Sequence, residues 1–188
     1  MRRSYFEHPP RYQILHCIKN RVTGGTSIFA DGYHVAYTLR QTHPEDFDVL
    51  STTPVPFHYI NDGHHLHHEH PTIELDPLSA GERVVKYINY SPPFQAPLIP
   101  SPTLPALHSA LKRFSTLLDD PINRVEYILR EGDAALFDNR RVLHARTAFT
   151  DSGGGIAGEP SRWLKGCYIE ADAVLDRGRV LRANIEKS

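Results

Sequence analysis

The sequence predicts a mainly β fold with flanking helices, of the β-sandwich or jelly-roll kind. Two observations support this class. Short runs rich in β-branched and aromatic residues alternate with turn formers, and the 15 prolines favour turns and loops over a helix bundle. At 188 residues the chain is long enough for one domain with a real core. We see no internal repeat and no domain boundary, so residues 1–188 are expected to form one domain.

The strands are predicted from their content of Val, Ile, Leu and aromatic residues and from the turn formers between them. They cover residues 11–19, 55–60, 72–75, 84–89, 124–129, 134–137, 142–149 and 163–169. A glycine-rich run at residues 152–158 predicts a flexible surface insertion before the last strand.

The helices are predicted from caps and from 3.6-residue periodicity. Asp31 can cap a helix that runs to about Arg40, with Val35, Ala36 and Leu39 facing inward. Residues 44–50 follow as a short helix with an acidic first turn, and residues 172–181 as a closing helix. A proline-rich connector at 97–105 leads into the best amphipathic helix, which is marked by Leu104, Leu107, Leu111, Phe114 and Leu118.

Charge and composition limit the partners and the compartment. A net charge of −1 gives no global field that would favour nucleic acid or a membrane surface. No apolar run approaches the ~20 residues of a membrane helix, and residues 1–4 lack the apolar core of a signal peptide. Cys17 and Cys167 fit a reducing compartment. We therefore expect a cytoplasmic protein, with the mitochondrion as the alternative.

His144 is the most informative candidate for chemistry. It follows the run Phe-Asp-Asn-Arg-Arg-Val-Leu in an apolar strand, and a neutral imidazole there is a good Fe(II) ligand. Non-haem iron oxygenases use two histidines and one carboxylate with open positions. The sequence holds no His-x-Asp pair to complete such a set. The alternative is a histidine that serves only the core.

Arg162 could hold an acidic cosubstrate, because a guanidinium makes two parallel hydrogen bonds to a carboxylate. It stands where an alternating strand begins. The alternative is a surface arginine after a glycine-rich loop. Arg146 shares the face of His144, as a second anion contact or an ion-pair partner.

Three further segments have a functional and a structural interpretation. In the segment 24–27, Gly24 and Gly25 let the backbone approach a ligand, and Thr26 or Ser27 could donate a hydroxyl; most such pairs are turns. The tract 63–70 could bind a divalent ion through His64 and His68 or through His67 and His70, although a solvated loop is favoured. The group Tyr87, Asn89, Tyr90 and Phe94 could hold a quaternary ammonium by cation–π attraction, or belong to the core.

Several stretches together resemble the γ-butyrobetaine hydroxylase branch of the TauD/TfdA-like Fe(II)/2-oxoglutarate dioxygenases. They are residues 5–17 (YFEHPPRYQILHC), 23–27 (TGGTS), 44–48 (PEDFD), 137–144 (FDNRRVLH) and 162–168 (RWLKGCY). The sister family, trimethyllysine dioxygenase, has similar motifs and is the close alternative.

This resemblance implies a fold, cofactors and site residues. The fold would be a partial double-stranded β-helix, a jelly roll. His144 would be the distal Fe(II) ligand and Arg162 the clamp of the 2-oxoglutarate carboxylate. Ser27, with Thr26 beside it, would contact 2-oxoglutarate, and Asn89 would fall near the substrate-binding amide. The family also implies ascorbate as an accompanying reductant, a small trimethylammonium substrate on the route to carnitine, and a homodimer.

The chain departs from the family pattern at its start. The iron-binding His-x-Asp should precede Leu-Pro-Tyr-Phe-Glu, but here residues 1–4 stand before Tyr5, with Arg2 about where the Asp belongs. We therefore expect the carboxy-terminal portion of a catalytic domain, truncated at its amino terminus, with little or no turnover. The alternatives are a non-catalytic binding or dimerisation module and a metal-binding protein that uses His64 to His70.

Overall fold

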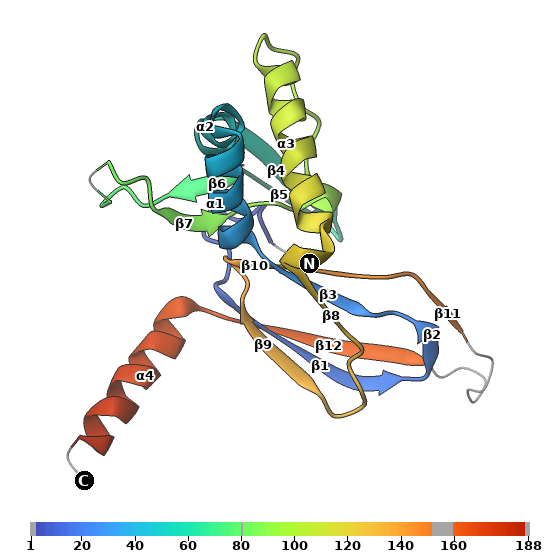
Figure 1. Cartoon of the computed structure of the whole chain (residues 1–188). Coiled ribbons are helices and arrows are strands. Elements are labelled where there is room, and N and C mark those ends of the chain that lie inside the picture. Colours follow the sequence, from blue (N-terminus) through green and yellow to red (C-terminus); the bar gives the residue numbers. More distant parts are fainter. Residues whose placement is uncertain (1–2, 80, 152–159, 187–188) are drawn as a thin grey trace. The chain divides into compact units, whose positions relative to one another are not determined.

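The computed structural model describes residues 3–79, 81–151 and 160–186 (Figure 1). These residues divide into two compact units. Unit 1 contains described residues from 3–9, 27–127 and 140–146, and unit 2 contains those from 10–26, 128–139 and 147–186. The insertion predicted at 152–158 and the position of Arg2 lie outside the described residues. The assignment of the chain to one catalytic domain stays a prediction.

The sheets of unit 1 are antiparallel. In the three-stranded sheet, β3 (Ser27–Asp31) lies between β10 (Val142–Arg146) and β8 (Arg124–Tyr127). Two further pairs complete the strands of this unit: β4 (Pro54–Asn61) with β5 (His64–Pro71), and β6 (Ile73–Leu75) with β7 (Val85–Ile88).

Three helices pack against one another and against the strands of unit 1 (Figure 1). They are α1 (Gly32–Thr42), α2 (Pro44–Thr52) and α3 (Leu104–Asp119), with short 3-10 turns η1 (Pro92–Phe94) and η2 (Pro121–Asn123). The predicted cap is confirmed, because the Asp31 carboxylate accepts a hydrogen bond from the Tyr33 N–H. Val35, Ala36 and Leu39 are fully buried, as predicted. Phe114 of α3 belongs to the same core.

Unit 2 is built on a second three-stranded antiparallel sheet. In it β1 (Tyr12–Asn20) lies between β12 (Arg162–Ile169) and β9 (Ala134–Asp138). A small ladder pairs β2 (Val22–Gly24) with β11 (Phe149–Asp151), and α4 (Ala171–Ile185) follows β12. Every residue of α4 is partly or fully exposed.

The loop favoured at residues 63–70 is wrong, because residues 64–70 lie in strand β5, although His64, His65, His67 and Glu69 are exposed. Asp62 and Gly63 both have positive φ, 51° and 77°, which suits a two-residue hairpin turn between β4 and β5. Strand alternation then buries His70 while His67 stays exposed. The Asp-Gly dipeptide was the signal for this hairpin.

The single strand predicted at 142–149 is also wrong, because it divides into β10 and β11, which pair with different partners. The opposing segment of the same chain divides into β2 and β3, because Gly24 and Gly25 between them have φ angles of 87° and 69°, which do not continue an extended strand. Among the described residues, no helix is long and apolar enough to cross a membrane.

Candidate functional site

His144 is the middle residue of β10 and is held by the β10–β3 ladder. Its cross-strand partner is Phe29, and Arg146 pairs with Ser27. Directly opposed residues of an antiparallel pair project to the same face, and so do residues two apart along one strand. His144, Arg146 and Ser27 therefore lie on one face of the sheet in unit 1. The sequence predicted the shared face of His144 and Arg146, and the ladder adds Ser27 to it.

Arg162, the first residue of β12, lies against Gly25 in unit 2. One terminal nitrogen donates to the Gly25 carbonyl at 3.5 Å, and the guanidinium carbon lies 5.3 Å from the centre of the Phe149 ring. A Cβ added to Gly25 would come 3.0 Å from Arg162 Nε. Gly25 thus allows the close approach that the sequence predicted for this pair of glycines, but the group that approaches is the Arg162 side chain.

Thr26 is tied to the segment before β11. Its N–H donates to the Thr147 hydroxyl at 3.0 Å, and the Thr147 N–H donates to the Thr26 carbonyl at 2.9 Å. In the same segment the Gly25 N–H donates to the Ala148 carbonyl at 3.0 Å. These hydrogen bonds hold Gly25 against the segment that leads into β11. We call Gly25 and the Arg162 side chain packed on it the Gly25 cradle.

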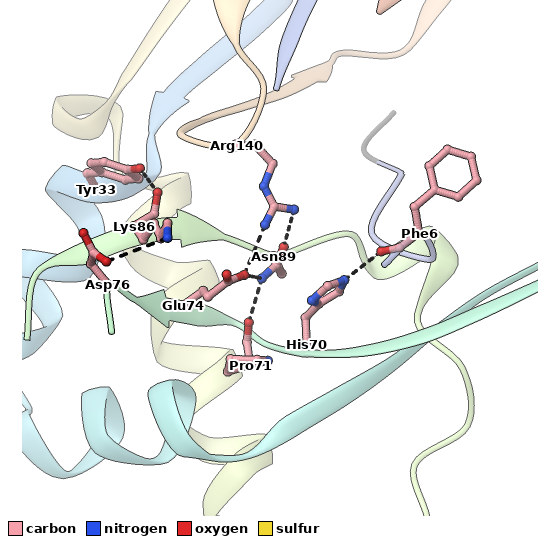
Figure 2. Close-up of polar contacts among 9 residues, drawn as sticks. All are labelled: Phe6, Tyr33, His70, Pro71, Glu74, Asp76, Lys86, Asn89 and Arg140. Atoms are coloured by element: carbon pink, nitrogen blue, oxygen red, sulfur yellow. Dashed lines mark hydrogen bonds and ion pairs between the residues drawn. The ribbon is translucent and has the colours of Figure 1, made fainter. Parts of the chain in front are cut away.

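Asn89 is 1% exposed and its amide is engaged within unit 1 (Figure 2). Its Nδ2 donates to the Pro71 carbonyl and to Glu74 Oε2, both at 3.1 Å, and its Oδ1 accepts from Arg140 at 2.9 Å. Arg140 lies within the stretch FDNRRVLH at residues 137–144, but the stretch alone assigns it no role. Its burial, to 5% exposure, is a tertiary property that the sequence does not display.

The three aromatic residues around Asn89 contact three different partners. The Tyr87 ring lies under the Arg140 guanidinium at 4.2 Å, and Tyr90 packs edge-on against Phe114. Phe94 packs edge-on against Tyr5. Tyr90 and Phe94 thus pack against the core of unit 1, whereas the printed ring contact of Tyr87 is with a cation of the chain itself.

The histidine tract contributes one buried and tightly bonded imidazole. His70 Nε2 donates to the Phe6 carbonyl at 2.8 Å (Figure 2), and the His68 ring centre lies 4.4 Å from that of His70. Burial lowers the pKa of His70, and the neighbouring His68 and Arg140 act in the same direction. His70 is therefore neutral at pH 7 and serves as a structural donor.

The Asp31 carboxyl joins the helix cap to the segment before β10. Burial acts to raise its pKa, but hydrogen bonds from Arg141 and from the backbone outweigh burial, so the pKa is lowered. Arg141 binds both carboxylate oxygens, with Nε 3.0 Å from Oδ1 and a terminal nitrogen 2.5 Å from Oδ2. Asp31 thus stays ionised and fixes this arginine.

Residues 1–168 match the profile of the family described as "Taurine catabolism dioxygenase TauD, TfdA family". The chain belongs to the TauD/TfdA dioxygenase family. The resemblance inferred from the sequence motifs is thereby confirmed, and family members are Fe(II)- and 2-oxoglutarate-dependent dioxygenases.

Curated relatives of this TauD/TfdA chain include dioxygenases that are named for different substrates. "Dioxygenase str8" of Strobilurus tenacellus is 57% identical over 180 residues, which are 95% of this chain and 42% of that protein. Human gamma-butyrobetaine dioxygenase is 35% identical over 185 residues, 95% of this chain and 45% of that protein. Rat mitochondrial trimethyllysine dioxygenase is 31% identical over 184 residues, with 95% and 41% covered. The chain thus spans less than half the length of these relatives.

Solved structures show the fold of the TauD/TfdA chain. An asparagine oxygenase in complex with Fe(II), 3-hydroxyasparagine and succinate matches with a TM-score of 0.63 and 21% identity, over 89% of this chain and 47% of that one. The non-haem iron oxygenase OrfP in complex with Fe and alpha-ketoglutaric acid matches with a TM-score of 0.59, 21% identity, and 93% and 49% coverage. The mainly β, jelly-roll class with flanking helices is confirmed.

The described residues do not provide a complete iron site. Across residues 3–79, 81–151 and 160–186, no three His, Cys, Asp or Glu side chains are grouped to hold a metal ion. The assignment of His144 as the distal iron ligand stays a prediction, and the sequence contains no His-x-Asp. The same finding leaves the histidines at 64–70 without a three-ligand metal cluster among the described residues.

Proposed function

We propose that this chain forms the carboxy-terminal part of an Fe(II)- and 2-oxoglutarate-dependent dioxygenase that oxidises a small molecule. His144 supplies one iron ligand, and Arg162 holds a cosubstrate carboxylate. The observation that supports the proposal is the Gly25 cradle. There the side chain of Arg162, the first residue of β12, lies against the backbone of Gly25. Ser27 and Thr26 are the proposed hydroxyl contacts to 2-oxoglutarate.

The proposal includes low activity for this polypeptide alone. A facial triad needs three protein ligands, and the described residues offer the single candidate His144 without a three-ligand group. Even changes to the residues that surround metal ligands cost about 10–100-fold in metal affinity or activity. We expect weak iron binding and little or no turnover, with cosubstrate binding through Arg162 as the retained function.

The substrate is proposed as a small trimethylammonium compound, either γ-butyrobetaine or, as the alternative, trimethyllysine. Relatives that carry these names support the proposal. The contacts of Tyr87, Tyr90 and Phe94 do not add to it, because each ring packs on a different neighbour. Asn89 as a substrate contact stays a prediction. We also propose a cytoplasmic location, with the mitochondrion as the alternative.

A 2-oxoglutarate titration of the full chain tests the proposal. Binding is followed by the fluorescence of Trp163, the single tryptophan, which directly follows Arg162. We expect saturable binding that Arg162→Lys weakens by about tenfold or more, because lysine cannot copy the two-pronged contact. Arg21→Lys is the matched control, since Arg21 makes an exposed ion pair with Glu131 in the same unit.

Two outcomes would contradict the proposal. Equal 2-oxoglutarate binding by the wild type and the Arg162→Lys variant would remove the carboxylate clamp. Succinate formation coupled to substrate hydroxylation, at a rate that His144→Ala abolishes, would contradict the expected loss of turnover. An anaerobic Fe(II) titration that follows the charge-transfer band of the iron–2-oxoglutarate complex measures the iron part separately.

Self-association is a second candidate function, favoured by exposed apolar residues on terminal strands. Among the described residues, β8 and β9 each end a three-stranded sheet. Val125 of β8 and Leu136 of β9 are each 67% exposed. Terminal strands with exposed apolar side chains can pair with a second copy. Size-exclusion chromatography with light scattering decides this, because a monomer over a wide concentration range would exclude it.

A further inference from the structure

An ion pair between the buried Arg140 and the partly buried Glu74, bridged by an amide, lies two residues before the strand that carries His144 (Figure 2). Arg140 donates through one terminal nitrogen to Asn89 Oδ1 at 2.9 Å and through the other to Glu74 Oε2 at 3.1 Å. Asn89 Nδ2 donates to the same Glu74 oxygen at 3.1 Å. The three side chains therefore form a closed triangle, with the Tyr87 ring on the guanidinium face.

The backbone of the same segment is held on two sides. The Ile88 N–H donates to the Arg140 carbonyl at 2.8 Å, and the Gly32 N–H donates to the Arg141 carbonyl at 3.1 Å. A Cβ at Gly32 would come 2.8 Å from that carbonyl oxygen, so the helix start and the Arg141 backbone are in close contact. The residue after Arg141 is the first residue of β10.

We propose that Arg140, held by Glu74 and Asn89, is a positioning residue that fixes the register of β10 and thereby the face to which His144 projects. The inference rests on the proposed function in its assumption that the direction of His144 matters for iron binding. Asn89 then acts through Arg140. Both N–H groups of its amide already donate, to Pro71 and Glu74, and its oxygen already accepts from Arg140, so a substrate that needs an amide N–H would have to displace one of these acceptors.

The register of β10 depends on a fixed contact such as that of Arg140 with Glu74 and Asn89, for a geometric reason. A strand slipped by one residue turns every side chain to the opposite face. β10 has five residues and pairs with β3 through the ladder from Val142 to Arg146. A slip would separate His144 from the face of Ser27. A forked guanidinium bound to two fixed acceptors tolerates no such shift, because both hydrogen bonds would break together.

Arg141 provides a matched control in the next position. It also forms an ion pair, with Asp31, but its side chain is 50% exposed, whereas that of Arg140 is 6% exposed. Exposed pairs contribute little, while one partner of a buried pair cannot be removed without leaving an uncompensated polar group. Lysine at either position keeps the positive charge but cannot make the two parallel hydrogen bonds of a guanidinium. The main difference between the two variants is therefore the burial of the arginine that is replaced.

The test is NMR spectroscopy on the full chain without iron or 2-oxoglutarate. Arg140→Lys, Glu74→Gln and Arg141→Lys are compared with the wild type through the His144 imidazole signals and the cross-strand contact between His144 and Phe29. Amide hydrogen exchange is measured in β10 and in α3. We expect Arg140→Lys and Glu74→Gln to shift the His144 signals, weaken the contact and raise exchange in β10 by about tenfold or more, with α3 unchanged.

Each other outcome overturns the proposal. Unchanged His144 signals in the Glu74→Gln variant would show that the ion pair does not control the strand, even if Arg140→Lys failed to fold. A uniform rise in exchange across β10 and α3 would assign Arg140 a general structural role. If Arg141→Lys changed the His144 signals and the exchange in β10 as much as Arg140→Lys does, Arg140 would not be the residue that fixes the register. Because the readout needs neither iron nor cosubstrate, these outcomes are separate from a failure of the proposed dioxygenase function.

Discussion

Replacing Gly25 by alanine tests the role of the cradle beneath Arg162. The added Cβ would lie 3.0 Å from Arg162 Nε and 3.4 Å from Phe149 Cβ, so the arginine must move by a few tenths of an ångström. Gly25 also has a φ of +69°, which costs an L-residue about 1–2 kcal/mol. The variant therefore combines a backbone cost with displacement of the guanidinium.

Gly132→Ala separates these two effects. Gly132 lies in the same unit with a φ of +93°, and a Cβ there would meet nothing within 4 Å. Both variants carry the cost of a positive φ and the same gain from a stiffer unfolded chain, which is about 0.4–1 kcal/mol. Their free energies of unfolding should therefore fall together. The difference between them in ligand binding reports on Arg162.

The assay pairs urea unfolding with the 2-oxoglutarate titration, both followed by Trp163 fluorescence. We expect similar unfolding midpoints for the two variants and about tenfold weaker 2-oxoglutarate binding, equivalent to about 1.4 kcal/mol, in Gly25→Ala alone. The reasoning is refuted if Gly25→Ala binds 2-oxoglutarate as tightly as Gly132→Ala does. A Gly25→Ala variant far less stable than Gly132→Ala would instead assign the cradle to folding.

Three further predictions concern unit 1. Phe114→Ala removes a fully buried ring and should lower the free energy of unfolding by about 3–5 kcal/mol, measured by urea denaturation; a loss below about 1 kcal/mol would contradict the core described here. Asp31→Ala removes the cap of α1 and should cost about 1 kcal/mol in the same assay, and Asp31→Asn should recover part of it because an amide oxygen can still accept from Tyr33. The lowered pKa of His70 means that the unfolded chain binds its proton more readily than the folded chain. Stability should therefore be full above the ordinary histidine pKa and fall as pH drops from about 6.5 toward the folded value. His70→Gln should flatten this dependence, and an unchanged slope would exclude His70 as its source.

Local signals were enough for much of the fold. Asp31 and the spacing of Val35, Ala36 and Leu39 predicted α1, because a cap and an apolar face are both properties of neighbouring residues. The hairpin at Asp62 and Gly63 was also encoded locally, but the density of histidines after it was read as a loop. The residues between β10 and β11 did not predict the break between these strands. The break follows from the positive φ angles of Gly24 and Gly25 in the segment that pairs with them.

The sequence by itself determined the family and the candidate residues His144 and Arg162. Motifs and their spacing can be recognised in the sequence without knowing which residues are in contact. Family membership does not test the roles of these two residues, which stay predictions. Only the tertiary structure decided that Gly25 accommodates an arginine, that the Asn89 amide bonds to Pro71, Glu74 and Arg140, and that Arg140 rather than Arg141 is buried. The physical reason is that burial and close approach depend on residues distant in sequence. The pairs 25 and 162, or 74 and 140, become neighbours only when the chain folds.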